Sequence, residues 1–191
     1  MSIIIRDLHF SYPDKVIFNG FSQEFSDGVF YSVSSPSGKG KTTLFRLIAG
    51  LERAESGTVQ VNGRLAYMFQ EDRLFPNLTV LENVRLAESG EYSAEEILSR
   101  LGLKGENNAY PDELSGGMKR RAALARTLLA PSQNIILDEP FTGLDEDARR
   151  NAIELVGELC QSKTLLIATH DETEREFCTQ HVTLSRRESN P

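Results

Sequence analysis

This sequence lacks a long hydrophobic run. Its apolar stretches, such as 29–33, 135–137 and 164–168, are short, whereas a membrane-spanning helix needs about 20 consecutive and mainly apolar residues. The first residues also lack the charged region, long apolar segment and small-residue cleavage site of a secretory signal. We therefore expect a chain that does not cross a membrane by itself and that works in the cytoplasm.

Cysteine and positive charge are also scarce. The two cysteines, Cys160 and Cys178, show neither the spacing of zinc ligands nor that of a redox pair, so we expect reduced thiols. Lys and Arg number 21 against 28 Asp and Glu, which gives a formal charge of −7. This balance disfavours broad contact with a phosphate backbone, and we expect no nucleic-acid partner.

Size and composition are those of an ordinary globular protein. The chain has 191 residues, of which 39% are hydrophobic and 26% charged. One hydrophobic core or one pair of packed layers can account for this length. We expect a single domain over residues 1–191.

Short β-branched and aromatic runs alternate with segments of helical period. Strands are expected at 3–6, 16–18, 29–33, 58–61, 65–69, 135–137, 165–169 and 182–184. Helices are expected at 41–49, 80–87, 94–101, 116–129, 146–160 and 172–178.

The order of these elements predicts an α/β fold with two parts. The first five strands have one long helix among them, whereas the last three alternate with helices, which favours an N-terminal antiparallel part joined to a parallel core. Residues from about 71 to 114 contain no expected strand and are interpreted as a small helical insert. Ser56-Gly57 and Asn62-Gly63 favour hairpin turns on either side of 58–61.

A candidate phosphate-binding loop follows the strand at 29–33 and leads into the helix at 41–49. Gly38 and Gly40 would let backbone N–H groups face a phosphate chain, Lys41 would reach the β- and γ-phosphates, and the Thr42 hydroxyl would bind Mg²⁺. Ser35 stands where the pattern has its first glycine, and a surface turn rich in Gly, Ser and Lys is the simpler alternative. The expected ATP-binding residues of this segment are Ser35, Pro36, Ser37, Gly38, Lys39, Gly40, Lys41, Thr42 and Thr43.

Two adjacent carboxylates end the apolar strand at 135–137. The carboxyl ends of parallel strands are where α/β sheets bind ligands. Asp138 would hold Mg²⁺, and Glu139 would activate the attacking water as a general base. Taken alone, this segment could also be a strand end followed by a turn.

A second candidate anion site precedes the helix at 116–129. The hydroxyl of Ser115 and the amides of Gly116 and Gly117 could bind a γ-phosphate at the start of this helix. An ordinary helix cap at Ser115 explains the same residues without a ligand.

The order of these motifs closely resembles the ABC ATPases, in which Leu-Ser-Gly-Gly lies between a phosphate loop and Leu-Asp-Glu-Pro, as at 114–117 and 137–140 here. The resemblance extends from about 8 to 170 and implies a P-loop NTPase core. It also implies ATP hydrolysis with ATP and Mg²⁺. Met118, in place of the usual glutamine, and Ser35 depart from the family pattern.

The resemblance assigns roles to further residues. Tyr12 looks like the aromatic residue that stacks on adenine, and Gln70 like the glutamine that meets Mg²⁺ and senses the membrane partner. Asp145 looks like the aspartate that communicates across a dimer, and His170 like the histidine that contacts the γ-phosphate. The expected catalytic set is Lys41, Gln70, Glu139 and His170, and the expected metal ligands are Thr42, Gln70 and Asp138.

The resemblance also implies partners. A second copy of the chain would cover ATP with Ser115, Gly116 and Gly117, and permease subunits would hold the dimer at the inner face of the membrane. The segment 69–84 resembles importer subunits of the nitrate, sulfonate and taurine group, which implies an extracytoplasmic solute-binding protein in the same system. Two alternatives remain, namely a non-transport ABC ATPase and a nucleotide-binding regulatory subunit with little turnover.

Overall fold

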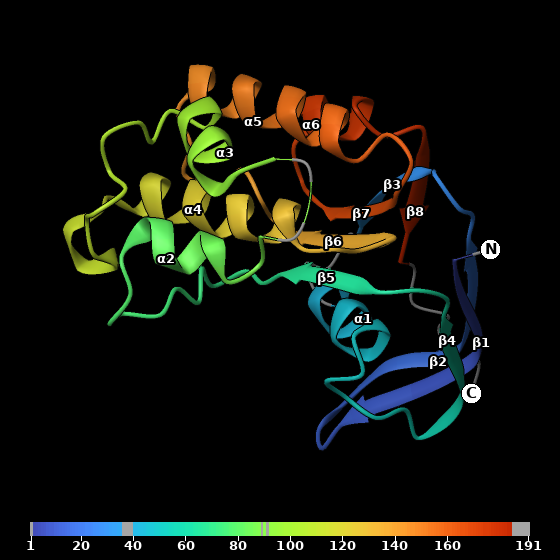
Figure 1. Cartoon of the computed structure of the whole chain (residues 1–191). Coiled ribbons are helices and arrows are strands. Elements are labelled where there is room, and N and C mark those ends of the chain that lie inside the picture. Colours follow the sequence, from blue (N-terminus) through green and yellow to red (C-terminus); the bar gives the residue numbers. More distant parts are fainter. Residues whose placement is uncertain (1, 36–39, 89, 91, 185–191) are drawn as a thin grey trace.

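The computed structural model describes residues 2–35, 40–88, 90 and 92–184, and its strands form two sheets (Figure 1). One is a five-stranded parallel sheet in the order β5-β6-β7-β3-β8, and the other is a three-stranded antiparallel sheet in the order β2-β1-β4. In chain order the strands are β1 (Ile3–Tyr12), β2 (Lys15–Phe25), β3 (Phe30–Ser34), β4 (Ser56–Val61), β5 (Leu65–Met68), β6 (Asn134–Asp138), β7 (Thr164–Ala168) and β8 (Gln180–Thr183).

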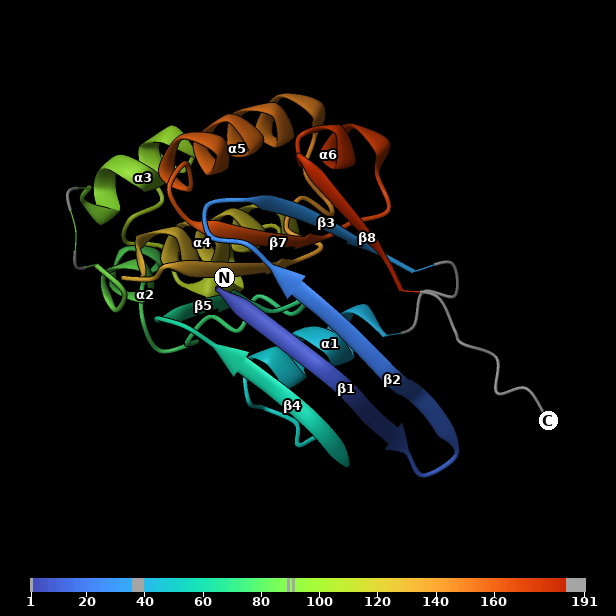
Figure 2. The same cartoon turned by 90° about the vertical axis from the view of Figure 1, so that its right-hand side faces the viewer.

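Helices lie on both sides of the parallel sheet. Figures 1 and 2 show α1 between the two sheets, and α3, α4 and α5 on the opposite side of the parallel sheet. The helices are α1 (Lys41–Ile48), α2 (Val80–Arg85), α3 (Ala94–Arg100), the 3₁₀ turn η1 (Pro111–Glu113), α4 (Gly116–Leu129), α5 (Glu146–Leu159) and α6 (Glu172–Glu176). No helix in the described part of the chain is both long and apolar enough to span a membrane.

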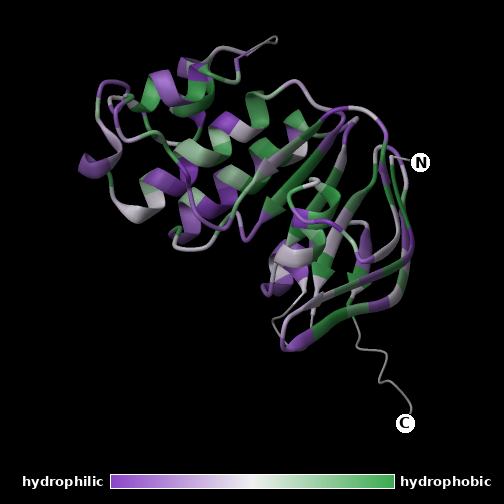
Figure 3. Ribbon diagram, turned by 90° about the horizontal axis from the view of Figure 1, so that it is seen from below, coloured by the Kyte–Doolittle hydropathy of each residue, from purple (hydrophilic) through white to green (hydrophobic). Residues whose placement is uncertain are grey.

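The central strands are apolar along their whole length because both of their faces are covered. Ile135 and Leu137 of β6 pack into a cluster with α2, α3, α4 and α5, whereas Ile136 between them packs with α1 and the antiparallel sheet. Successive side chains of a strand point to opposite faces, so a continuous apolar run supplies two cores at once. Figure 3 shows these strands coloured mainly as hydrophobic.

All eight strands and all six helices expected from the sequence are confirmed, with shifted ends. The sorting of the strands is only partly right. Of the first five, β1, β2 and β4 form the antiparallel sheet, but β3 and β5 belong to the parallel core. The sequence alone does not show which sheet each strand joins, because this depends on pairing between distant segments, such as β3 with β7.

The expected hairpin turns beside 58–61 are wrong. Gly57 lies inside β4 with a φ of +87°, where a Cβ atom would be 2.2 Å from the carbonyl oxygen of Asp7. The glycine therefore permits a bulge opposite β1, whose register shifts between Arg6 and His9. Asn62-Gly63 connects β4 to β5, and these strands belong to different sheets.

The segment 71–114 contains α2, α3 and η1, and its described residues contain no strand. The oxygen of Ser93 accepts a hydrogen bond from the Glu96 amide at the start of α3. A reciprocal capping box, missed in the sequence, joins Thr79 and Glu82 at the start of α2. The limits of the insert, and its place within a single domain, stay predictions.

Candidate functional site

A cavity of about 360 Å³ lies at the start of α1. Strands β1 and β2 form one wall, the first turn of α1 forms another, and the loops after β5 and β6 contribute one side chain each. Its described lining is Tyr12, Lys15, Ile17, Gly40, Lys41, Thr42, Thr43, Gln70 and Glu139. Segments separated by more than a hundred residues in the sequence therefore meet around one space.

The start of α1 suits a bound anion. Gly40 precedes the helix with a φ of +116°, a conformation that a residue with a side chain rarely adopts. Among the described residues no side chain caps this end, and no acidic residue occupies the first turn. The N–H groups of the first turn and the positive end of the helix dipole therefore suit an anion in the cavity. The expected loop residues Pro36, Ser37, Gly38 and Lys39 lie outside the described residues, whereas Ser35 is buried.

Lys41 is the centre of a polar cluster. Its side chain is only 4% exposed, and its Nζ lies 3.6 Å from Oε1 of Glu139 and donates a hydrogen bond to Nε2 of His170. The Nε2 of Gln70 donates to Oε2 of Glu139 at 3.4 Å. The four residues expected to be catalytic are thus brought together.

Glu139 has a strained backbone. Its φ is +52°, in the left-handed region that residues with side chains avoid. Its N–H donates to the carbonyl oxygen of Ala168 at the end of β7, over 3.0 Å. Strain of this kind persists where surrounding contacts impose it, and it is frequent in active sites.

Asp138 is 1% exposed and has an unsatisfied oxygen. Tyr67 donates to Oδ2 over 3.4 Å, while the buried Oδ1 has no protein partner. Burial raises the pKa of this carboxyl, and the nearby charge of Glu139 adds to the effect, while the Thr42 hydroxyl and Lys41 act against it. A cation would satisfy the free oxygen and favour the charged form.

Mg²⁺ fits this donor set. The orphaned Oδ1 of Asp138, the Thr42 hydroxyl and the Gln70 amide oxygen are hard oxygen donors. The described residues contain no cluster of three or more His, Cys, Asp or Glu side chains that could hold a metal. Mg²⁺ usually takes one or two carboxylates from a protein and completes its coordination with phosphate oxygens and water.

The residues of the second candidate anion site lie elsewhere in the chain. Ser115 caps α4 by accepting a hydrogen bond from the Met118 amide at 3.3 Å, as the simpler alternative required. Gly116 and Gly117 form the first turn of α4, and a Cβ atom at Gly117 would be 3.0 Å from the carbonyl oxygen of Gly143. None of the three is among the described residues that line the cavity.

Asp145 likewise caps a helix, since its side chain accepts a hydrogen bond from the Ala148 amide at 2.8 Å at the start of α5. From the next turn, Arg149 reaches Asp171 at 2.6 Å. This ion pair connects α5 to the residue directly after His170. Sequence motifs alone could not reveal that link, because its two members are 22 positions apart.

Two residues of the cavity wall were missed in the sequence. Lys15 and Ile17 line the cavity from β2, and Lys15 pairs directly with Tyr12 across the β1–β2 hairpin. The turn formed by Pro13 and Asp14 carries the signal that could have found them, because it folds β2 back beside Tyr12.

Comparison with known proteins agrees with this geometry. The profile of the family described as ABC transporter matches residues 18–142, which is more than half of the chain. The chain belongs to the ABC transporter family. As a member, it has an α/β P-loop fold and is an ATP-binding ATPase.

Relatives of this ABC ATPase include import subunits. The aliphatic sulfonates import ATP-binding protein SsuB 1 of Pseudomonas syringae pv. syringae (strain B728a) is 36% identical, and the alignment covers 93% of this chain and 78% of the relative. SsuB 1 of Nocardia farcinica (strain IFM 10152) is 38% identical over 91% of this chain and 74% of its own length.

Solved ABC cassettes share the fold. A dimeric structure of the bacterial ABC transporter cassette MJ0796 has a TM-score of 0.85 at 27% identity and covers 95% of this chain and 94% of its own. Another dimeric structure of MJ0796, in a post-hydrolysis state bound to ADP and Pi, has a TM-score of 0.83 at 25% identity, with coverage of 96% and 94%.

Proposed function

We propose that this chain is the ATP-hydrolysing subunit of an ABC importer for small solutes. The convergence of Lys41, Gln70, Glu139 and His170 beside the start of α1 supports this proposal best. The names of the relatives support import rather than export. We expect the chain to act at the inner face of the cell membrane, held there by permease subunits, with an extracytoplasmic solute-binding protein delivering the cargo.

The residues of the cavity divide the work of binding ATP. Tyr12 packs edge-to-face on Phe10 and lines the cavity, so its ring can stack on adenine. Lys41 and the amides at the start of α1 bind the phosphates. Thr42, Gln70 and Asp138 would hold Mg²⁺, which when bound neutralises charge on the phosphate oxygens.

Glu139 would act as the general base. Its strained backbone and its contacts with Lys41 and Gln70 hold the carboxylate beside the proposed phosphate site. From there it can accept a proton from the water that attacks the γ-phosphate. His170 would contact the γ-phosphate, because its Nε2 already lies beside Lys41.

A second copy would complete the site. Ser115, Gly116 and Gly117 lie outside the cavity of their own chain, so in our proposal they cover ATP bound by the other copy. Amides at the start of α4 suit the γ-phosphate. Asp145 at the start of α5 would then report the state of one site to the other.

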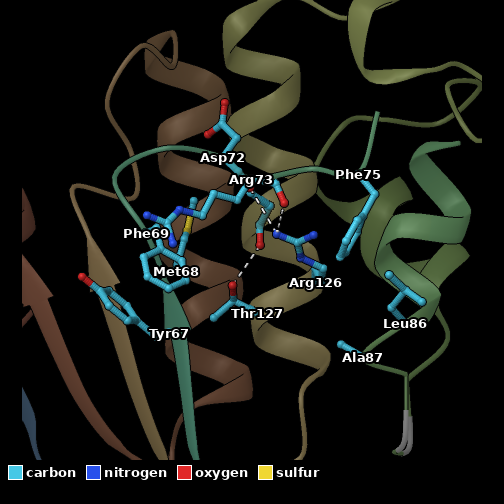
Figure 4. A pocket seen from close by; sticks show the side chains of 11 residues that line it. Tyr67, Met68, Phe69, Asp72, Arg73, Phe75, Leu86, Ala87, Arg126 and Thr127 are labelled. Carbon is cyan, nitrogen blue, oxygen red and sulfur yellow. Dashed lines mark hydrogen bonds between the residues drawn. The ribbon is translucent and has the colours of Figure 1, made fainter. Parts of the chain in front are cut away.

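A groove beside Gln70 would receive the permease. It has a volume of about 340 Å³ and lies between the loop after β5 and the helices α2 and α4 (Figure 4). Phe75 and Leu86 on its edge are 54% and 60% exposed, while Arg73 lies over the ring of Phe69 at 3.7 Å. An amphipathic permease segment would bury the two apolar side chains and meet the arginine with an acidic one.

Replacing Glu139 with glutamine tests the mechanism. Glutamine keeps the shape of the side chain but cannot accept a proton, so Glu139→Gln should bind Mg-ATP, lose turnover and accumulate as an ATP-dependent dimer. Light scattering after gel filtration would compare samples without nucleotide, with ADP and with Mg-ATP. A variant that hydrolyses ATP normally and stays monomeric would refute both the role of Glu139 and the shared site.

One observation supports the alternative of a regulatory subunit with little turnover, namely that Ser35 stands where the phosphate-loop pattern has a glycine. Steady-state ATPase measurements, with and without the solubilised permease, separate this alternative from the importer. A chain that binds ATP but shows no hydrolysis in either sample would favour the regulatory role.

A further inference from the structure

Arg120 lies in the second turn of α4, and its guanidinium is buried, with the residue only 5% exposed. Its Nη1 donates to the carbonyl oxygens of Phe69 and Gln70, each at 2.9 Å, and to Oδ1 of Asp72 at 3.1 Å. Its Nη2 donates to the carbonyl oxygens of Asp138 and Glu139 at 2.5 and 2.7 Å. One side chain therefore holds four backbone carbonyls and a carboxylate.

These carbonyls belong to two loops of the proposed catalytic site. The loop after β5 carries Gln70, and the loop after β6 carries Glu139. The side chains of these two residues meet at 3.4 Å. Arg120 hydrogen-bonds to the backbones of both segments and so connects them independently of that side-chain contact.

The contact with Glu139 falls where the backbone is strained. The N–H of Glu139 is bonded to Ala168, and its carbonyl oxygen is bonded to Arg120. At a residue with a side chain, the left-handed backbone conformation is less stable than the right-handed one, and this difference lowers its population about tenfold. Removing the bond to the carbonyl frees one of the two anchors that impose this conformation.

We propose that Arg120 is a positioning residue for ATP hydrolysis, which holds Glu139 and Gln70 in register and ties them to α4. The inference rests on the proposed role of Glu139 as the base. Since Ser115 caps α4, a shift of this helix when its first turn engages ATP on the other copy would move Arg120 and, with it, the Glu139 backbone. The planar guanidinium presents N–H donors from several nitrogens in fixed directions, whereas lysine has donors on a single nitrogen and cannot reach all of these oxygens.

Five variants of the full chain test the proposal. Arg120→Met keeps length and burial but removes all donors, whereas Arg120→Lys keeps the charge. Arg100→Met is the control, because Arg100 of α3 donates to the carboxylate of Glu158 in α5 at 2.9 Å, away from both loops. Glu139→Gln, alone and combined with Arg120→Met, closes a double-mutant cycle.

Arg120→Met should lower kcat about tenfold or more while the KM for ATP stays within about twofold, since Lys41 and Thr42 still hold the nucleotide and Mg²⁺ while Glu139 is misplaced. Arg120→Lys should be slowed as well, and Arg100→Met should hydrolyse ATP normally. In the Glu139→Gln background, Arg120→Met should cause no further loss. A residue that served folding alone would move KM and the unfolding temperature instead, without this dependence on Glu139.

Several results would overturn the inference. Normal kcat in Arg120→Met, or a loss that adds in full to that of Glu139→Gln, means that Arg120 does not act through Glu139. If Arg120→Met fails to fold, the same comparison is made with Arg120→Lys. If Glu139→Gln itself hydrolyses ATP normally, the proposed base is wrong and the failure belongs to the proposed function. Full loss in Glu139→Gln with normal rates in both Arg120 variants defeats the inference alone.

Discussion

Asn83 in α2 holds the loop that shapes the proposed permease groove. It is fully buried, and its Oδ1 accepts a hydrogen bond from the Phe75 amide at 2.7 Å. Its Nδ2 donates to the carbonyl oxygens of Phe75, Leu78 and Thr79 at 3.0–3.1 Å. The side chain thus replaces the secondary structure that this loop lacks.

Replacing Asn83 with alanine removes these bonds and should destabilise the chain. Thr79 and Phe75 keep other partners, because their carbonyl oxygens also accept from the amides of Asn83 and Leu78. Loss of the other two bonds, at about 1 kcal/mol each, lowers the free energy of unfolding by about 2 kcal/mol. For a chain of this size we expect the melting temperature to fall by about 4 to 8 °C.

The measurement is thermal unfolding followed by circular dichroism, with Asn77→Ala as the control. Asn77 lies exposed in the same loop, and its replacement should change the free energy of unfolding by less than about 0.5 kcal/mol. Asn83→Asp gives a second test. Its carboxylate would face three carbonyl oxygens, so we expect strong destabilisation at pH 7 that lessens as acid protonates the group. Equal melting temperatures for Asn83→Ala and Asn77→Ala would refute the reasoning.

Three further predictions concern nucleotide binding and pH. Lys41→Ala should abolish Mg-ATP binding in calorimetry, and failure of the unmodified chain to bind would mean that Ser35 has disabled the loop. Ser35→Gly should leave ATP affinity unchanged or improve it, so a marked loss would reveal a contact made by the serine itself. Burial raises the pKa of Glu174 in the folded chain. The stabilisation that this side chain provides is therefore complete below its pKa in the unfolded chain, and it is lost as the pH rises through its pKa in the folded chain. Glu174→Gln should therefore raise the melting temperature more at pH 8 than at pH 4.5, and an equal shift at both would contradict this.

The local parts of the site follow directly from the sequence. The start of α1 at Lys41, the cap of α4 at Ser115 and the cap of α5 at Asp145 all lie where the sequence places them. Each depends on a few neighbouring residues, such as a glycine that tolerates positive φ or a side chain that accepts a bond three residues along. Such interactions need no information from the rest of the chain. The grouping of Lys41 with Glu139 and His170 came from family resemblance rather than from periodicity.

Only the tertiary structure decided how distant segments combine. The assignment of β3 and β5 to the parallel sheet and the bulge at Gly57 depend on strands that pair across long stretches of sequence. The same holds for Arg120. In the sequence it is one more basic residue of an amphipathic helix, and in the fold it is a buried donor to the backbones of Gln70 and Glu139. Its role was hidden because backbone carbonyls are the same at every residue, so no side-chain pattern marks which of them a guanidinium will meet once β5, β6 and α4 pack together.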